Sequence, residues 1–297
     1  MRRYLAIALG ILGVLLFSTK AVLVKLAYGH GVDTISLLLL RMAFALPFYL
    51  FTIFVLWKKE SEASPKDYLW TVFFGFLGYY LASFLDFWGL QFLKASIERL
   101  VLFTYPSLVF LISYFFLGKS GTKYQFISLA ISYTGIVIVF APELSIGQEG
   151  DVLSGGTLVF LSGLSYAIYI AGSGWLIPKM GALRFTAYCM TVSCTLVLIH
   201  FLVVDGELAA LSSLPQEVFG YAFLMAIFAT VIPSYLISLA IKTIGANGFA
   251  LYGSLGPIST IGLAYFFLGE NLSFLQWVGG MVVILGVALP EIARKKQ

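Results

Sequence analysis

The stretch Ala95–Lys119 reads ASIERLVLFTYPSLVFLISYFFLGK, and its echo Ala246–Glu270 reads ANGFALYGSLGPISTIGLAYFFLGE, 151 positions later. In this ungapped register Pro106 pairs with Pro257, and both stretches contain Tyr-Phe-Phe-Leu-Gly before their last residue. The same register pairs further positions, namely Gln125 with Gln276 and Gly135 with Gly286. Agreement of aromatic, proline and glycine positions in one register is improbable by chance, so the chain contains an internal repeat.

The composition around this repeat is that of a membrane protein. Of 297 residues, 60% are apolar and only 11% are charged, and the mean hydropathy is +0.98. A soluble domain carries about 25% charged residues, so this chain could not cover its own surface in water. The net charge of +4 is too small and dispersed for binding nucleic acid. Cys189 and Cys194 form neither a disulfide framework nor a zinc motif.

The apolar runs have the length of a lipid bilayer, which requires about 20 residues per helix. They occupy residues 4–25, 35–57, 69–93, 96–117, 123–141, 152–176, 183–204, 217–241, 246–268 and 273–292. We therefore predict an all-α integral membrane protein of about ten transmembrane helices. The repeat register divides it into two five-helix halves, residues 1–142 and 152–292, followed by a basic cytoplasmic tail at 293–297.

The distribution of lysine and arginine predicts the orientation of the chain. With the N-terminus in the cytoplasm, 13 basic residues fall on the inner side and only two on the outer side. The inner residues are Arg2, Arg3, Lys58, Lys59, Lys66, Lys119, Lys123, Lys179, Arg184, Lys242, Arg294, Lys295 and Lys296; the outer ones are Lys25 and Lys94. Both termini are thus predicted to be cytoplasmic. Five spans per half place the second half upside down relative to the first, an arrangement typical of secondary transporters.

With these features the chain resembles the drug/metabolite transporter superfamily, and within it the EamA-type repeat. The resemblance runs from Ala6 to about Pro290 and rests on the Phe-Phe-Leu-Gly endings and the glycines that follow, Gly279, Gly280 and Gly286. The first repeat departs from the pattern because Lys119 stands where the second keeps Glu270. The resemblance implies a carrier of the bacterial inner membrane, commonly an exporter of amino acids or other small metabolites. It also implies a central cavity formed by spans one, three, four, six, eight and nine.

Five ionisable residues fall within the predicted spans, where a charge is costly and usually functional. They are Lys20, Arg41, Asp86, Glu98 and Arg99. The topology places all five in the outer third of the membrane. Their counterparts in the second half are uncharged, namely Ala167, Tyr188, Ile237, Phe249 and Ala250. The charges are therefore an asymmetric feature on a symmetric scaffold.

We expect these five side chains to form a polar network at the outer mouth. It would act as a gate whose ion pairs break on opening, or bind a zwitterion, with arginine taking the carboxylate and Asp86 the ammonium. In a third interpretation, Asp86 or Glu98 carries a coupling proton. The competing interpretation is that Lys20 and Arg41 only extend to the lipid headgroups.

Polar stripes at helical spacing mark the candidate walls of a cavity. Span three carries Tyr79, Ser83, Asp86 and Leu90; span six carries Ser162, Ser165, Tyr166, Tyr169 and Ser173; span eight carries Thr230, Ser234 and Ser238. Tyr105 and Tyr252 flank the matched prolines, and Pro106 and Pro257 are candidate hinges. Hydroxyl residues also serve close helix packing, and that alternative stays open for spans six and eight.

No catalytic, metal-binding or ATP-binding motif occurs, so no enzyme activity, cofactor or metal is expected. The sequence favours a secondary-active carrier that exports small metabolites by alternating access, with a proton as a candidate coupling ion. The alternatives are a facilitator or exchanger working in either direction, a membrane enzyme acting on lipids, and a sensor or subunit without transport. The expected partners are a small-molecule substrate and membrane lipid, without nucleic acid, and no oligomeric state is predicted.

Overall fold

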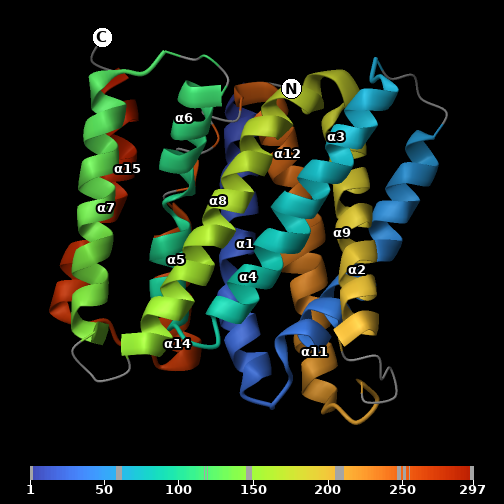
Figure 1. Ribbon diagram of the computed structural model, residues 1–297. Coiled ribbons are helices and arrows are strands. Elements are labelled where there is room, and N and C mark those ends of the chain that lie inside the picture. The colour runs from blue at the N-terminus through green and yellow to red at the C-terminus, as the bar shows by residue number, and fades with distance from the viewer. Residues whose placement is uncertain are drawn as a thin grey trace.

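The computed structural model describes residues 3–57, 62–116, 118, 120–144, 149–204, 211–245, 249, 252–253 and 255–294, which form a bundle of helices without strands (Figure 1). The helices are α1 (Arg3–Tyr28), α2 (Thr34–Leu56), α3 (Pro65–Gly75), η1 (Phe76–Leu81), α4 (Ala82–Gly89), α5 (Ala95–Leu102), α6 (Tyr105–Phe116), α7 (Lys123–Leu144), α8 (Glu149–Met180), α9 (Ala182–Val204), α11 (Gln216–Ala226), η2 (Ile227–Val231), α12 (Ile232–Ile244), α14 (Leu255–Leu268) and α15 (Phe274–Arg294).

Helical segments occupy the predicted apolar runs. Within the described part of the chain, eight are long and apolar enough to cross a bilayer, and the apolar parts of α14 and α15 are shorter. Three of the predicted spans are composite: α3, η1 and α4 form the third, α5 and α6 the fourth, and α11, η2 and α12 the eighth. The start of the ninth predicted run lies outside the described residues. Helix α1 begins and α15 ends at the same end of the bundle, as an even number of crossings requires (Figure 1).

Three helix boundaries differ from the predicted ones, and at the third span the difference comes from helix capping. The third span begins at Pro65 rather than 69, because Ser64 and Asp67 form a capping box around the first turn, with Pro65 at the first helical position. Helix α7 continues to Leu144 and α15 to Arg294, so the predicted boundaries at 142 and 293 fall inside helices. The last residues of the predicted tail, 295–297, lie outside the described part of the chain.

The two halves repeat each other in local detail. The π-helices η1 and η2 begin at Phe76 and Ile227, which are 151 positions apart. The caps of the last span in each half also match: the Thr122 amide donates to Gln125 Oε1 at 2.8 Å, and the Ser273 amide to Gln276 Oε1 at 2.9 Å. The sequence repeat is therefore a structural repeat.

The seam between α7 and α15 relates the halves by a pseudo-two-fold axis. A Cβ atom added to Gly135 would lie 2.7 Å from the Val283 amide nitrogen, and one added to Gly286 would lie 2.8 Å from that of Ser132. These contacts are equivalent, because Ser132 and Val283 are also 151 positions apart. Glycine lets the two backbones approach this closely. Figure 1 shows α7 and α15 side by side at one edge of the bundle.

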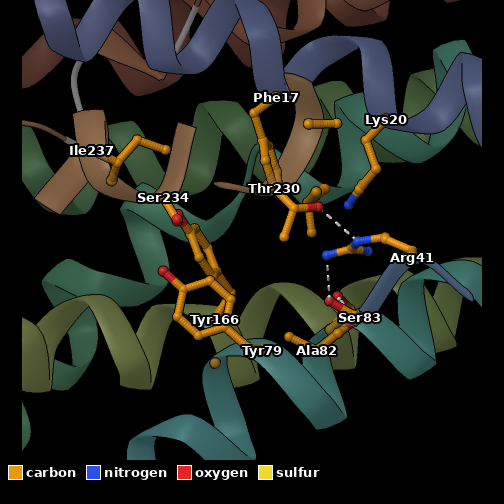
Figure 2. Close-up of a pocket in the computed structure, with 14 residues that line it drawn as sticks. Phe17, Lys20, Arg41, Tyr79, Ala82, Ser83, Tyr166, Thr230, Ser234 and Ile237 are labelled. Atoms are coloured by element: carbon orange, nitrogen blue, oxygen red, sulfur yellow. Dashed lines mark hydrogen bonds between the residues drawn. The ribbon is translucent and has the colours of Figure 1, made fainter. Parts of the chain in front are cut away.

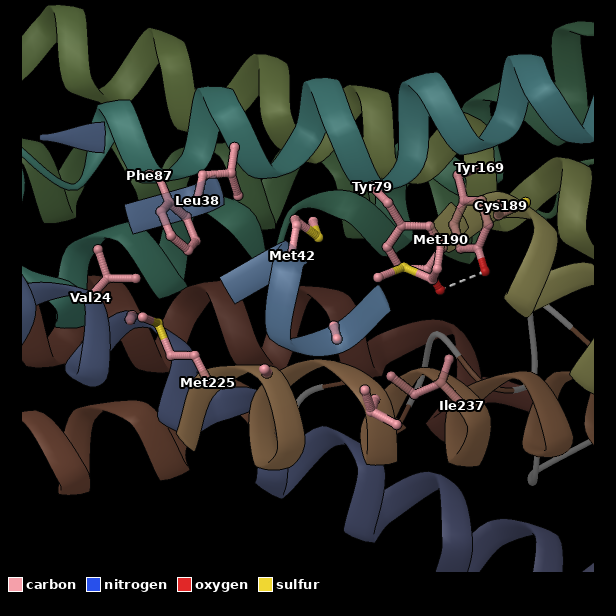
Figure 3. Packing of buried hydrophobic residues seen from close by; sticks show 14 of the residues in the cluster. Val24, Leu38, Met42, Tyr79, Phe87, Tyr169, Cys189, Met190, Met225 and Ile237 are labelled. Atoms are coloured by element: carbon pink, nitrogen blue, oxygen red, sulfur yellow. Dashed lines mark hydrogen bonds between the residues drawn. The ribbon is translucent and has the colours of Figure 1, made fainter. Parts of the chain in front are cut away.

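The remaining helices surround a densely packed centre. Leu38 and Met42 on α2 pack with Phe87 on α4 in one continuous apolar cluster (Figure 3). In the same cluster, the Tyr79 and Tyr169 hydroxyls are hydrogen-bonded at 2.8 Å. Polar side chains at the centre are therefore held in a rigid apolar frame.

Candidate functional site

Two adjoining compartments lie at the centre of the bundle. Each has a volume of about 40 Å³, and they share the wall residues Phe17, Leu102, Tyr166 and Ile237. A volume of this size holds only a few water molecules. Most of the lining side chains are buried, so the chamber is occluded in this conformation. We call the compartment that contains Lys20 and Arg41 the cationic compartment and the one that contains Arg99 the proline compartment.

The cationic compartment is built on the two π-helices. Gly78 and Tyr79 come from η1, and Ala229 and Thr230 come from η2. In η1 the Leu77 carbonyl accepts from Ser165 Oγ at 2.8 Å. In η2 the Thr230 hydroxyl donates to the carbonyl of Met225, in the preceding helix α11 (Gln216–Ala226), at 2.9 Å. π-Helical turns are frequent at functional sites. The equivalent turns of both halves thus meet at one cavity.

Lys20 and Asp86 form a buried ion pair beside this compartment. Lys20 Nζ lies 2.6 Å from Asp86 Oδ2, and the two side chains are only 4% and 1% exposed. Lys20 Nζ also lies 4.7 Å from the centroid of the Phe17 ring, a cation–π distance. The pair joins α1 to α4 inside the bundle.

Arg41 enters the cationic compartment from α2 and is bound by hydroxyl groups. Its Nε donates to Thr230 Oγ1 at 2.8 Å, and its Nη2 donates to Ser83 Oγ at 3.5 Å. Figure 2 shows both bonds and places Lys20 beside the guanidinium group. The guanidinium carbon also lies 5.1 Å from the centroid of the Phe87 ring. Arg41 therefore bridges the two halves through one hydroxyl from each.

Glu98 and Arg99 extend the charged cluster toward the proline compartment. Glu98 is fully buried and interacts electrostatically with Asp86. Arg99 Nε donates to Thr260 Oγ1 at 2.9 Å, and its Nη2 donates to the Phe17 carbonyl at 2.9 Å. Arg99 thus connects α5 to α1 and α14, and both of these hydrogen bonds are short.

The matched prolines lie at the starts of helices α6 and α14. Pro106 is the second residue of α6, directly after the break at Phe103 and Thr104, and Pro257 lies in the first turn of α14. Proline cannot donate the amide that would continue the preceding helix. Tyr105, at the start of α6, and Pro257 both line the proline compartment. The first turns of α6 and α14 therefore both border this compartment.

The predicted site residues separate into three groups. Those lining the cationic compartment are Lys20, Arg41, Tyr79, Ser83, Tyr166 and Ser234. Those lining the proline compartment are Arg99, Tyr105, Tyr166 and Pro257. Those that line neither are Asp86, Glu98, Pro106, Ser165, Tyr169 and Tyr252; Tyr252 is half-buried. Ser165 binds a backbone carbonyl, which agrees with the packing interpretation of span six for that residue.

One interpretation of the charges needs correction. Lys20 and Arg41 are 3% and 2% exposed, so neither side chain reaches the surface of the bundle. Phe17 and Phe87 lie against the cations of the enclosed cluster, and its role as a gate at the outer mouth stays a prediction. Among the described residues, Lys20–Asp86 is the ion pair that this cluster forms. The arginines bind hydroxyl and carbonyl oxygens instead.

Sequence reasoning missed three contributors. Phe17 contacts both Lys20 and Arg99, and its position three residues before Lys20 on one helix is the only sequence signal. Tyr49 hydrogen-bonds Ser234 at 2.9 Å across the halves. Glu270 accepts from the Ala95 amide at 2.8 Å and so caps α5 from the other half. The acid that ends the second repeat thus closes the helix carrying Glu98 and Arg99.

A bundle of apolar helices in two inverted halves, enclosing an occluded polar chamber, defines a membrane transporter. The model of the EamA-like transporter family matches residues 4–141 and 153–290, and the chain belongs to this family. Within the described residues no group of three or more His, Cys, Asp or Glu side chains could hold a metal ion.

Similar proteins agree with this class. A Bacillus subtilis protein named "Uncharacterized transporter YcbK" is 29% identical over 91% of this chain and 87% of its own length. An Archaeoglobus fulgidus protein named "Uncharacterized transporter" is 24% identical over 94% of this chain and 93% of its own. A crystal structure with 15% sequence identity superposes with a TM-score of 0.71 and covers 97% of this chain and 98% of that one, which shows the shared fold.

Proposed function

We propose that this protein is a secondary-active transporter that exports small metabolites, such as amino acids, across the bacterial inner membrane by alternating access. The observation that carries the proposal is the occluded chamber between two inverted halves, with equivalent π-helices at its wall. Rocking one half against the other would open such a chamber to each side in turn. Both termini would lie in the cytoplasm, where the basic loops belong.

The alternative within transport is a facilitator or exchanger that works in either direction. The direction of transport follows from the gradients of substrate and coupling ion across the membrane, so the same chamber serves export and exchange. A sensor or subunit without transport has less support, because a buried charged chamber is costly and has no evident use in a static protein.

Flux through proteoliposomes tests the proposal. Purified protein is reconstituted into liposomes preloaded with amino acids, amines, sugars or nucleosides, and counterflow of the labelled compound is measured. We expect accumulation above that in protein-free liposomes for at least one class. Absence of counterflow across all four classes would favour the sensor or subunit.

Proton coupling is proposed for the carboxyl pair Asp86 and Glu98. The two groups interact inside the bundle, with Asp86 held by Lys20 at 2.6 Å. Neighbouring enclosed carboxyls can share one proton, because like charges disfavour the doubly ionised form. A proton and a cationic group on the substrate would compete for the same pair, which is the logic of antiport.

Glu98→Gln is expected to abolish the pH dependence of flux, because an amide cannot exchange the proton. Counterflow at constant substrate concentration, measured at a series of pH values, checks the expectation. Asp86→Asn provides the comparison, since it also breaks the ion pair with Lys20 and should lower stability as well. A wild-type pH profile in the Glu98 variant would remove Glu98 from coupling.

A further inference from the structure

Among the described residues, Arg41 forms no ion pair of its own. The nearby carboxylate, Asp86, is 2.6 Å from Lys20, and Arg41 donates to the neutral hydroxyls of Thr230 and Ser83. The bond to Ser83, at 3.5 Å, is at the limit of hydrogen bonding. Nη1 has no hydrogen-bond partner among the described residues although Arg41 is 2% exposed. A buried cation with such partners is poorly compensated.

The charge balance of the central cluster also indicates an uncompensated positive charge. Its buried cations are Lys20, Arg41 and Arg99, and its buried acids are Asp86 and Glu98. Even with both acids ionised, the described cluster has one positive charge too many. A protonated acid would increase the excess. One negative charge supplied from outside would balance the cluster.

Geometry selects Arg41 rather than Arg99 as the place for that charge. Arg99 is held by Thr260 and by the Phe17 carbonyl, both at 2.9 Å. Arg41 presents its Nε and Nη2 to hydroxyls on opposite halves, and both hydroxyls line the cationic compartment (Figure 2). This planar fork of donors matches a carboxylate. The small volume and the single missing charge favour a carboxylate over a phosphate ester.

The geometry points to Arg41 as the residue that recognises a carboxylate group of the transported molecule, seated between Thr230 and Ser83. This inference rests on the proposed transport function and adds the substrate class. The incoming carboxylate accepts from Nε and Nη2 in place of the two hydroxyls. Tyr79 and Tyr166 line the same compartment, and the rest of the molecule would lie against them once the compartment widens.

Matched probes test the inference even while the natural substrate is unidentified. Each set holds an amino acid, its amide and its decarboxylated amine: alanine, alaninamide and ethylamine, then phenylalanine, phenylalaninamide and 2-phenylethylamine. Counterflow is measured for the wild type, Arg41→Gln, Arg41→Lys and the control Arg184→Gln. Arg184 is also a buried arginine, but it donates to the Leu56 carbonyl, outside the chamber.

We expect wild-type flux of the carboxylate to exceed that of its amide and amine by about tenfold or more, and Arg41→Gln to lose that advantage. Arg41→Lys should retain part of it, because the charge remains without the fork. Arg184→Gln should keep the full preference. Equal flux of amide and carboxylate in the wild type, or an unchanged preference in Arg41→Gln, overturns the inference.

Thermal unfolding without ligand gives a second readout. Arg41→Gln should unfold at the wild-type temperature or above, because it removes an uncompensated charge; a large fall would make Arg41 structural and overturn the inference. Transport of amines alone would sink the inference and leave the proposed function standing. Absence of flux for every probe, charged or neutral, would count against the proposed function and against the inference that rests on it. Flux without a preference for the carboxylate would overturn the inference alone.

Discussion

Replacing Lys20 with methionine is expected to lower the free energy of unfolding by about 3–5 kcal/mol, because it leaves Asp86 buried without its partner. Asp86 is 1% exposed and lies 2.6 Å from Lys20, so water cannot replace the ammonium group. Methionine matches the length and volume of lysine, so loss of charge dominates over loss of packing. Denaturant titration of the purified protein in detergent, followed by circular dichroism, measures the change.

The double variant Lys20→Met/Asp86→Leu is the control for this prediction. It removes both charges, and an apolar pair of similar volume is often as stable as the ion pair it replaces. We therefore expect it to recover most of the stability lost in Lys20→Met. A single variant within about 1 kcal/mol of the wild type, a value typical of exposed pairs, would show that water reaches this pair.

Gly78→Ala is expected to destabilise the protein by about 1–3 kcal/mol, by overpacking, and to reduce flux sharply. A Cβ atom at Gly78, in η1, would overlap Cβ and Cγ of Tyr169 on α8. Those atoms lie near the backbone, so rotation of the ring cannot relieve the clash. Moving η1 away from α8 would displace Tyr79 and the wall of the cationic compartment. Thermal unfolding and counterflow together check both effects.

Gly262→Ala is the matched control, because Gly262 also lies within a helix but a Cβ atom there would meet nothing within 4 Å. Its stability should stay near the wild-type value or rise slightly, since alanine restricts the unfolded chain more than glycine. If both variants behave alike, the contact between η1 and α8 is looser than the structure indicates.

The sequence predicts the spans and the inverted repeat well, because a bilayer imposes helix length and the register of 151 is visible in the residues. It also identifies the five buried charges by their cost in lipid. It does not predict which charges pair, since Lys20 and Asp86 are 66 positions apart along the chain. The π-helices have no sequence signature here, so their roles in positioning Gly78 and Thr230 emerge only in three dimensions.

Hydroxyl stripes show the same division. Ser83 and Ser234 line the cationic compartment, and Ser165, on an equally regular stripe, binds the Leu77 carbonyl instead. Helical periodicity defines a face but does not distinguish a wet wall from a packed seam. The size of the side chains on the facing helix decides whether a hydroxyl stripe lines a cavity or packs against that helix, and the sequence does not show which helix faces it.

The two oxygens that hold Arg41 come from opposite halves of the molecule, Ser83 from the first and Thr230 from the second. Arg41 is itself in the first half, so any tilt that parts the halves at this level must stretch or break its bond to Thr230. A carboxylate that takes both donors of the guanidinium would replace this bond, and the freed Thr230 and Ser83 hydroxyls would donate to the carboxylate from both halves. Cargo would then lower the energy of the shut intermediate, and the loaded carrier would cross between its two open forms more readily than the empty one.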